Sequence, residues 1–401
     1  MAEIIPFKGL RYNSEKVGDY SKVIAPPYDV ISKEMQDDLY NSSEYNIIRL
    51  IDNRSEGQGR YTDAAQNFED WQAKNVLVQD EESAIYVYEQ DFEYQGKIMR
   101  RKGFLAALKV QPLGEGLIYP HERTMSKPKE DRLKLLKETK ANLSPIFSLY
   151  VNDGGIKSIL DEVTANKPDV EAVDSAGVMQ KIWRLIDPEK IKKIQQSMKG
   201  KELFIADGHH RYETSLMYKE EQASGEGKSS DYTMMMFVDM DDPGLVIKPT
   251  HRIVTLDKVS FDQLKENLRA DFDLEKADTL EEILRLLEEN KDKVVFGLSN
   301  GREFWFLKYK FNTEFDLEIL HRELKKYLGI ISSTVQDYIK FSADPHQALS
   351  KASENKAVFF VNPTPIETVK NMARAHQIMP QKSTYFYPKL TDGLVIRKLT
   401  D

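Results

Sequence analysis

The sequence contains no cysteine, no long apolar run and none of several familiar catalytic signatures. The absence of cysteine excludes disulfide bonds, thiolate metal sites and cysteine nucleophiles, and it suits a reducing compartment. The N-terminal segment MAEIIPFKGLRY lacks the apolar core of a signal peptide, and no apolar run approaches membrane-spanning length. No HExxH, GxSxG or GxGxxG pattern occurs, so zinc proteases, α/β-hydrolases and Rossmann enzymes have little support. We therefore expect a cytoplasmic protein without a membrane segment.

Acidic residues outnumber basic ones, 65 to 57, and histidine is scarce. The formal net charge is −8 at pH 7, which argues against a general nucleic-acid binder. The chain has only 7 histidines among 401 residues. Most of them fall in the segments discussed below, namely His121, His209, His210 and His251. Unpaired loop histidines next to arginine and glutamate suit phosphate chemistry near neutral pH.

Helix-like and strand-like segments intermix along the whole chain, which predicts an α+β or mixed α/β fold. A chain of 401 residues is long enough for two or three domains. The pattern favours an N-terminal α/β segment over 1–103, a core over 104–255 with an insertion near 152–200, and a C-terminal α/β segment over 256–401. The last boundary is set where charged helices with leucine spacing begin, near Ser260.

Strand signals are clearest in three places. The aromatic-rich stretch SAIYVYEQDFEYQGKIMRRKGFLAALKV predicts two or three strands, with turns at Gln95–Gly96 and Lys102–Gly103. KELFIA, just before residue 207, predicts another strand. YTMMMFVDM is a continuous apolar run, which is typical of a strand buried on both faces.

The segment FIADGHHRYETSLMY contains two adjacent histidines where a strand pattern ends and a helical pattern begins. Gly208 permits a tight turn, and the free amides of the helix start favour an anion. His209, His210 and Arg211 add donors around it. Asp207 either caps the helix or holds a magnesium ion. The alternative is a capped helix with Arg211 in a surface ion pair, while a two-histidine metal site is disfavoured because adjacent helical residues point in different directions.

YPHERT contains His121 and Glu122 directly after a strand-like segment. A loop glutamate beside a histidine is a candidate general base, and the alternative is a solvated glutamate. The basic segment that follows is mostly typical of a solvated helix face. Its members nearest the loop, Lys127 and Arg132, are candidates for contacting a phosphate.

Two later segments add further candidates. MPQKSTYFYPK concentrates hydroxyl and ammonium groups between two prolines, which suits oxyanion recognition, and the alternative is an aromatic strand with exposed lysines. PTHR supplies a histidine and an arginine that either bind substrate or simply end a strand. The candidates for phosphate or donor binding are Lys382, Ser383, Thr384 and Lys389, and those for substrate binding are His251, Arg252 and Tyr387.

The order of these segments carries a family resemblance. Pro120–Glu122, a helix with DRLKLL, an apolar strand and FIADGHHR resemble the ParB/sulfiredoxin-like fold, and most of all its free-serine kinase branch. In that branch a Pro-His-Glu loop precedes an Asp-Gly-His-(His/Thr)-Arg turn. This resemblance covers about residues 104–220, and the insertion near 152–200 departs from the compact pattern. The whole chain also resembles a bacterial family long catalogued as a domain of unknown function, through PPYDV, HERT…DR…NLSPIF, DGHHRYET, PTHR and MPQKSTYFYPK.

The kinase resemblance implies a function. Glu122, flanked by His121, would take the proton from a substrate hydroxyl, while Asp207, His209 and Arg211 would grip the donor's phosphates. The implied reaction phosphorylates a small hydroxyl metabolite, with free L-serine the leading substrate, using magnesium and ADP, ATP or pyrophosphate. Two alternatives stay open: a non-enzymatic ParB-like nucleotide-binding regulatory module, and a phosphatase acting on phosphoserine. The oligomeric state is left open.

Overall fold

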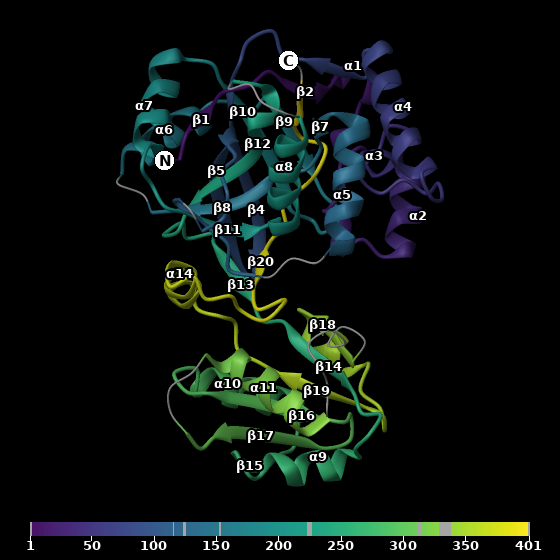
Figure 1. Ribbon diagram of the computed structural model, residues 1–401, viewed down its shortest axis with the longest axis vertical. Helices are drawn as coiled ribbons and strands as arrows, with labels where there is room; N and C mark the ends of the chain where they lie inside the picture. The colour runs from purple at the N-terminus through teal and green to yellow at the C-terminus, as the bar shows by residue number, and fades with distance from the viewer. Residues whose placement is uncertain are drawn as a thin grey trace. The chain divides into compact units, whose positions relative to one another are not determined.

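The chain forms two compact units, Met1–Val246 with Pro388–Asp401, and Ile247–Tyr387. The computed structural model describes residues 2–114, 116–122, 126–151, 154–222, 227–311, 315–328 and 338–399, without the side chains of 126 and 127. Helices and strands intermix in both units, which confirms the mixed α/β fold class (Figure 1). The three predicted segments stay a prediction, and one β-hairpin spans the first of their boundaries, after residue 103.

The first unit is built on a nine-stranded sheet with the order β6-β11-β8-β12-β5-β4-β10-β9, in which β1 also pairs with β5. These strands are β1 (Ile4–Ile5), β4 (Ile85–Tyr94), β5 (Lys97–Lys109), β6 (Ile118–Tyr119), β8 (Ile146–Tyr150), β9 (Val170–Val173), β10 (Met179–Leu185), β11 (Leu203–Asp207) and β12 (Tyr232–Asp239). The apolar run of β12 lies between β5 and β8 and is almost wholly buried. The predicted buried strand is therefore confirmed, as is the strand predicted from KELFIA.

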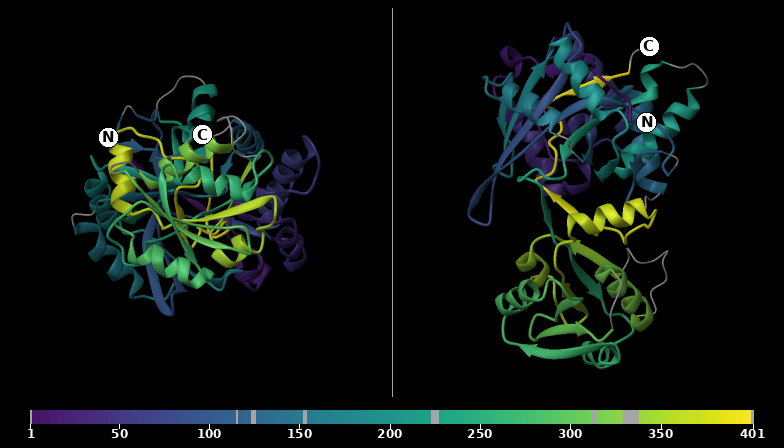
Figure 2. Two further views of the ribbon diagram at one scale, coloured as in Figure 1. Left: turned by 90° about the horizontal axis from the view of Figure 1, so that it is seen from below. Right: turned by 90° about the vertical axis from the view of Figure 1, so that its left-hand side faces the viewer.

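The β4–β5 hairpin confirms one predicted turn and corrects the other. Gln95 and Gly96 both have positive φ, 51° and 72°, and they form the turn between the two strands. The turn predicted at Lys102–Gly103 is wrong, because Gly103 lies inside β5 opposite Val238. A Cβ at Gly103 would stand 2.2 Å from the carbonyl oxygen of Phe237, so this glycine serves a close backbone approach. The hairpin tip extends past the neighbouring strands, as Figure 2 shows.

The helices of the first unit are α1 (Ser14–Val17), α2 (Lys33–Ser42), α3 (Ile48–Ile51), α4 (Gly59–Ala73), α5 (Ser126–Thr139), α6 (Gly155–Thr164), α7 (Pro188–Met198) and α8 (His209–Glu221), with short 3-10 turns at η1 (Tyr20–Lys22), η2 (Tyr28–Val30) and η3 (Ser229–Asp231). Helices α6 and α7 pack their apolar residues on the large sheet. Helix α8 follows β11 and packs beside α5, which in turn contacts α4 (Figure 1). The helices predicted from DRLKLLKETKAN and GHHRYETSLMYKEEQ are both present.

The C-terminal segment completes the first unit. A second sheet has the order β3-β2-β21-β7, with β2 (Gly9–Tyr12), β3 (Leu77–Gln79), β7 (Ala141–Asn142) and β21 (Ile396–Lys398). Because β21 pairs with both β2 and β7, the residues from Pro388 onward are anchored among segments far away in sequence. A core that includes Leu10, Phe68, Trp71, Leu135 and Ile396 joins this sheet to helices α2 to α5.

The second unit has a six-stranded sheet with the order β15-β17-β16-β19-β14-β18, and a two-stranded pair β13-β20. The strands are β13 (Val246–Lys248), β14 (His251–Thr255), β15 (Phe272–Ala277), β16 (Val295–Ser299), β17 (Phe304–Tyr309), β18 (Ile339–Ser342), β19 (Lys356–Phe360) and β20 (Tyr385–Tyr387). The helices are α9 (Phe261–Leu268), α10 (Leu280–Glu289), α11 (Asp316–Leu328), α13 (Pro345–Leu349) and α14 (Ile366–Arg374). Helices α9 and α10 confirm the charged, leucine-spaced pattern. Their N-caps, Ser260 and Thr279, each accept a backbone hydrogen bond.

Across the described ranges, no helix combines the length and the apolar composition that crossing a bilayer requires.

Candidate functional site

Strands β6 and β11 bring the two main sequence motifs side by side. They pair in parallel, with Ile118 opposite Leu203 and Tyr119 opposite Phe204. The segments that follow the two strands therefore leave the sheet at the same end. Tyr119 and Phe204 also stack, with ring centroids 5.3 Å apart. Past this edge the backbone N–H of His121 donates to Nε2 of His209 at 3.3 Å. The Pro-His-Glu loop and the Asp-Gly-His-His-Arg turn are therefore direct neighbours.

Gly208 makes the turn from β11 into α8 as its sequence context predicts. Its φ is +90°, a left-handed conformation that side chains rarely adopt. The guanidinium of Arg211 folds back onto this glycine, and a Cβ at Gly208 would meet it at 3.0 Å. Arg211 Nη2 donates to Asp207 Oδ2 at 2.7 Å, and its Nη1 donates to the carbonyl of Pro145. The turn therefore holds the guanidinium in one orientation above the start of α8.

Asp207 lies between two cations. Its Oδ2 accepts from Arg211, and its Oδ1 accepts from Lys389 Nζ at 2.7 Å. The side chains of Lys389 and Asp207 are only 12% and 20% exposed, so water screens this cluster weakly. The formal charges of Asp207, Arg211 and Lys389 leave one net positive charge at the mouth of the turn, which is the sign that a phosphate requires.

The two histidines at this edge are buried and uncharged. His121 and His209 are 1% and 6% exposed, and their rings meet edge to face at 4.6 Å. Burial lowers the pKa of His121 to about 4, and burial followed by the neighbouring His121 lowers the pKa of His209 well below its usual value. At pH 7 neither ring brings a positive charge, and Nε2 of His209 is occupied as an acceptor. These histidines shape the turn, whereas Arg211 and Lys389 supply its charge.

The remaining residues predicted in this region are Glu122, His210, Lys127 and Arg132. Glu122 lies just beyond β6 and His210 in the first turn of α8, and both are half-buried. Lys127 belongs to α5, but its side chain lies outside the described part of the structure.

Arg132, one turn and a half further along α5, is almost fully buried. Its guanidinium carbon lies 3.9 Å from the centre of the Tyr28 ring, and its Nη1 donates to the carbonyl of Ile51 at 2.8 Å. Asp131 pairs with the same guanidinium. The PPYDV loop, noticed in the sequence without a role, thus supplies the aromatic face on which Arg132 rests.

A small cavity of about 50 Å³ lies between the two arginines. Its lining combines Arg132 and Arg211 with apolar side chains such as Leu135, Leu143 and Ile146 and with the hydroxyl-bearing Ser144, Thr214, Ser215 and Thr233. Ser144 Oγ donates to Oδ2 of Asp392 at 2.6 Å, and Asp392 is fully buried. Burial raises the pKa of this carboxyl to about 7, although Arg211, the hydrogen bond from Ser144 and Arg132 act in the opposite direction.

Sequence reasoning missed Ser144 and Asp392. Ser144 lies in NLSPIF, which was noted only as a recurring segment, and Asp392 lies in a Thr-Asp-Gly turn with no catalytic signature. The two residues are 248 positions apart, so no local spacing pattern relates them. Only the antiparallel pairing of the C-terminal segment, as at Ala25 and Asp392, brings them together.

Most of the later candidates belong to the second unit. Arg252 is fully buried; it donates to Nε2 of His321 at 3.4 Å and to the carbonyl of Lys382 at 3.3 Å. His251, which begins a strand instead of ending one, is 1% exposed, and burial lowers its pKa to about 4.

The hydroxyl and aromatic members of KSTYFYPK in the second unit also lie in local contacts. Ser383 Oγ donates to the carbonyl of Pro380 at 2.6 Å, and Thr384 next to it is buried. Lys248 Nζ stands 3.3 Å from the centre of the Tyr387 ring. That these residues and His251 and Arg252 bind donor or substrate stays a prediction, while Lys389 belongs to the first unit and contacts Asp207.

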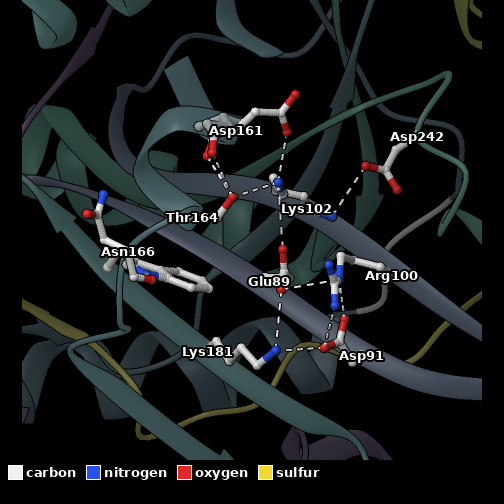
Figure 3. Close-up of polar contacts among 11 residues, drawn as sticks. Glu89, Asp91, Arg100, Lys102, Asp161, Thr164, Asn166, Lys181 and Asp242 are labelled. Carbon is white, nitrogen blue, oxygen red and sulfur yellow. Dashed lines mark hydrogen bonds and ion pairs between the residues drawn. The ribbon is translucent and has the colours of Figure 1, made fainter. Parts of the chain in front are cut away.

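A second polar cluster lies on the adjacent strands β4, β5 and β10. There Glu89, 4% exposed, lies within 3.7 Å of Lys102, Arg100 and Lys181. Figure 3 shows how Asp91 and Asp161 complete this network with the same cations. A cavity of about 210 Å³ borders it, lined on one side by Asp239, Asp241 and Asp242. Arg100 and Lys102 are each paired with carboxylates, and these ion pairs link β5 to its neighbours. We therefore interpret the network as structural support of the β4–β5 hairpin.

The described residues contain no preformed magnesium site around Asp207. Within the ranges that the structure describes, no three histidine, aspartate or glutamate side chains are grouped as a metal site requires. Each oxygen of Asp207 already accepts from a cation. The expectation that Asp207 holds magnesium therefore stays a prediction, and no step below depends on it.

Comparison with known proteins gives a family and several distant structures. Residues 4–327 match the family model described as "Protein of unknown function (DUF1015)". None of the curated proteins matches. Solved structures similar to this chain include a free serine kinase mutant in complex with ADP (14% identity, TM-score 0.37, 67% of this chain and 84% of that chain). Others are a conserved hypothetical protein from Pyrococcus furiosus (15%, 0.38, 71% and 94%) and C-terminally truncated SbnI from Staphylococcus aureus (11%, 0.37, 70% and 78%).

Proposed function

This chain belongs to the DUF1015 family, and we propose that it is a phosphotransferase acting on a small hydroxyl metabolite. The leading substrate is free L-serine, converted to O-phosphoserine, with ADP, ATP or pyrophosphate as the phosphoryl donor. The observation that carries the proposal is the parallel pairing of β6 and β11, which makes the Pro-His-Glu loop and the Asp-Gly-His-His-Arg turn neighbours. A kinase needs its base and its phosphate cradle adjacent, and these two segments resemble those two parts.

The phosphate cradle consists of the α8 start and the cations around Asp207. The first backbone amides of a helix have no acceptor within that helix, and the helix dipole adds positive potential at the same end, so the start of α8 after Gly208 suits an anion. Arg211 and Lys389 carry the charge, and Asp207 fixes both. Phosphoryl transfer is catalysed chiefly by positioning and charge neutralisation, which is what such a rigid cluster supplies.

Glu122 is the proposed general base. It is half-buried at the end of β6, next to the buried and uncharged His121. In the reaction its carboxylate takes the proton of the acceptor hydroxyl as the hydroxyl oxygen attacks the donor's terminal phosphorus. The leaving group is AMP when ADP is the donor, ADP when ATP is the donor, and phosphate when pyrophosphate is the donor. Arg211 and Lys389 balance the charge on the transferred group.

Two other functions use the same anion site. A nucleotide-binding regulatory module would bind the donor without turnover, and a phosphatase would use water as the acceptor. Half-buried Glu122 beside the cradle favours transfer over binding alone, because a binding module has no need of a base at that position.

The deciding experiment is a donor screen read by phosphorus NMR. The 401-residue chain is incubated with L-serine, magnesium and ADP, ATP or pyrophosphate in turn, and with phosphoserine alone to test for phosphatase activity. We expect O-phosphoserine with one of the donors, no product with Glu122→Gln, and normal product with Glu220→Gln, an exposed glutamate on α8. Absence of phosphoserine with every donor, or full turnover in Glu122→Gln, would refute the proposal. Binding without turnover would identify the regulatory module.

A further inference from the structure

Ser144 and Asp392 form a hydrogen-bonded pair that the proposed reaction does not use. Ser144 Oγ donates to Asp392 Oδ2 at 2.6 Å. Asp392 is 0% exposed, and its other oxygen, Oδ1, has no hydrogen-bond partner in the described part of the chain. A fully buried carboxyl with one satisfied and one unsatisfied oxygen is costly to the fold, so it calls for a functional explanation.

The backbone holds Asp392 firmly against Ser144. Asp392 N–H donates to the carbonyl of Ala25 at 2.8 Å, and Ala25 N–H donates back to the carbonyl of Asp392 at 3.2 Å. The next residue, Gly393, has a φ of +95°, and a Cβ there would stand 3.2 Å from Ile47 and from the carbonyl of Val23. The backbone on both sides of Asp392 is therefore fixed, and it places the carboxyl within hydrogen-bond distance of the serine hydroxyl.

Two guanidinium groups flank the same serine. Ser144, Arg132 and Arg211 line one cavity of about 50 Å³. Arg211 donates to the carbonyl of Pro145, the residue after Ser144, and Arg132 donates to the carbonyl of Ile51, which also lines the cavity. Both guanidinium groups are thus held beside Ser144 by a backbone carbonyl and by one carboxylate each, Asp207 for Arg211 and Asp131 for Arg132. Two arginines with remaining donors in one cavity are suited to contact a phosphoryl group.

The carboxyl is suited to exchange a proton near neutral pH. Burial raises the pKa of Asp392 to about 7, against the lowering effect of Arg211 and Arg132. A base whose pKa lies near the working pH combines a useful ionised fraction with a real driving force for accepting a proton. A serine hydroxyl with a carboxylate within hydrogen-bond distance has the two parts of an activated nucleophile, and two guanidinium groups line the cavity beside it.

We propose that Ser144 is itself a phosphoryl acceptor, with Asp392 as its base and Arg132 and Arg211 as the cations that receive the group. Its Oγ attacks the terminal phosphorus of the donor, and the new bond is Oγ–P. The bond between that phosphorus and the bridging oxygen breaks, and phosphate or a nucleotide leaves with the bridging electron pair. The serine proton passes to Oδ2 of Asp392. The inference rests on the proposed function for the donor, and not on Glu122 or on free serine as an acceptor.

The test maps the phosphate on the unaltered chain. The protein is incubated with ATP, ADP or pyrophosphate and magnesium, without serine, then digested with trypsin and sequenced by fragmentation mass spectrometry. The tryptic peptide of residues 141–157 contains Ser144 and Ser148, which fragmentation separates, and Ser158 falls on the next peptide. We expect one added phosphoryl group on Ser144. Because a phosphoserine ester survives acid, acid treatment distinguishes it from a phosphohistidine or an acyl phosphate.

Variants then separate the role of each partner. Ser144→Ala removes the label, Ser158→Ala on the exposed face of α6 leaves it unchanged, and Asp392→Asn slows labelling by about 100-fold, within the range typical of a general base. An unmodified Ser144 in the unaltered chain while free phosphoserine forms would overturn the inference and leave the proposed function standing. Phosphorylated Ser144 without formation of free phosphoserine would support the inference and refute free serine as the acceptor. Equal labelling rates in Asp392→Asn would overturn the assignment of the base.

Discussion

Lys389 Nζ lies 2.7 Å from Oδ1 of Asp207, although 182 residues separate the two along the chain. The other oxygen of the same carboxylate accepts from Arg211, so Asp207 orders two cations at the start of α8. This arrangement explains why a carboxylate stands in a site proposed to bind phosphate. It does not repel the donor, because it is outnumbered by the cations that it fixes.

Replacing Lys389 by methionine removes one of these cations and keeps most of the side-chain length. We expect kcat/KM for the donor to fall by about 10- to 100-fold, since one charge-assisted hydrogen bond contributes about 1.5 to 3 kcal/mol. Steady-state kinetics with the donor found in the screen measure the change. Lys193→Met, at an exposed position of α7, is the matched control and leaves the kinetics unaltered. Unchanged kinetics in Lys389→Met would remove Lys389 from the site.

Gly208→Ala and Gly18→Ala separate backbone strain from damage to the site. Both glycines have positive φ, +90° and +68°, so each substitution costs about 1 to 2 kcal/mol of stability. Nothing stands within 4 Å of a Cβ at Gly18, whereas a Cβ at Gly208 meets the Arg211 guanidinium at 3.0 Å. We expect the midpoint temperature of thermal unfolding to fall by a similar amount in both variants. The affinity for the donor is expected to fall only in Gly208→Ala. Equal affinities in the two variants would contradict the part assigned to Arg211.

His121 makes the fold sensitive to acid. Its pKa is about 4 in the folded chain against 6.5 for an ordinary histidine, so the unfolded chain binds the extra proton between these values. Stability is therefore lost as pH falls from 6.5 towards 4, by up to about 3 kcal/mol from this residue. Urea unfolding at several pH values measures it, and His121→Asn is expected to flatten this part of the profile. A profile identical to that of the unaltered chain would show that His121 titrates normally.

Asp392 acts in the opposite direction. Its pKa is about 7 in the folded chain against the ordinary 3.8, so the folded chain holds the extra proton between these values. Its contribution to stability is complete at low pH and falls as pH rises through this window, by up to about 4 kcal/mol. Asp392→Asn is therefore expected to gain stability relative to the unaltered chain as pH rises from 4 to 7. The same urea experiments test the sign, and a relative loss over that range would show that the carboxyl is ionised when folded.

Gly103→Ala tests the strand contact that replaced a predicted turn. Its Cβ would stand 2.2 Å from a carbonyl oxygen of the neighbouring strand, so β5 and β12 must separate. We expect a loss of about 3 kcal/mol or more in the free energy of unfolding. Gly59→Ala at the start of α4, where the nearest atom is 3.6 Å away, is the control and is expected to be neutral or slightly stabilising. A loss no larger than the control's would mean that the strands part easily.

The sequence alone predicted most of the elements around the site. The apolar runs that form β11 and β12, the helix start after Gly208 and the amphipathic α5 were all recognisable, because periodicity and glycine placement are local properties. The turn predicted at Gly103 was wrong, because a glycine inside a strand has the same local sequence signature as a glycine in a turn.

The charge state and the partners of the site residues depended on the tertiary structure. The sequence predicted His121 and His209 as hydrogen-bonding groups of a phosphate site, and only the structure shows that burial keeps both rings neutral at pH 7. Arg132, a candidate among several basic residues of α5, is singled out by Tyr28 from a loop about 100 positions earlier.

What the sequence by itself determined is the turn and its chemistry, because Asp207, Gly208 and Arg211 act through contacts within five residues of one another. Only the tertiary structure decided which distant residues contact this region: Lys389 donates a hydrogen bond to Asp207, and Ser144 donates one to Asp392. Both depend on the return of the C-terminal segment, which pairs β21 with β2 and β7. Strands far apart in sequence pair because they bury a common hydrophobic core, and a local sequence pattern does not predict which strands those are.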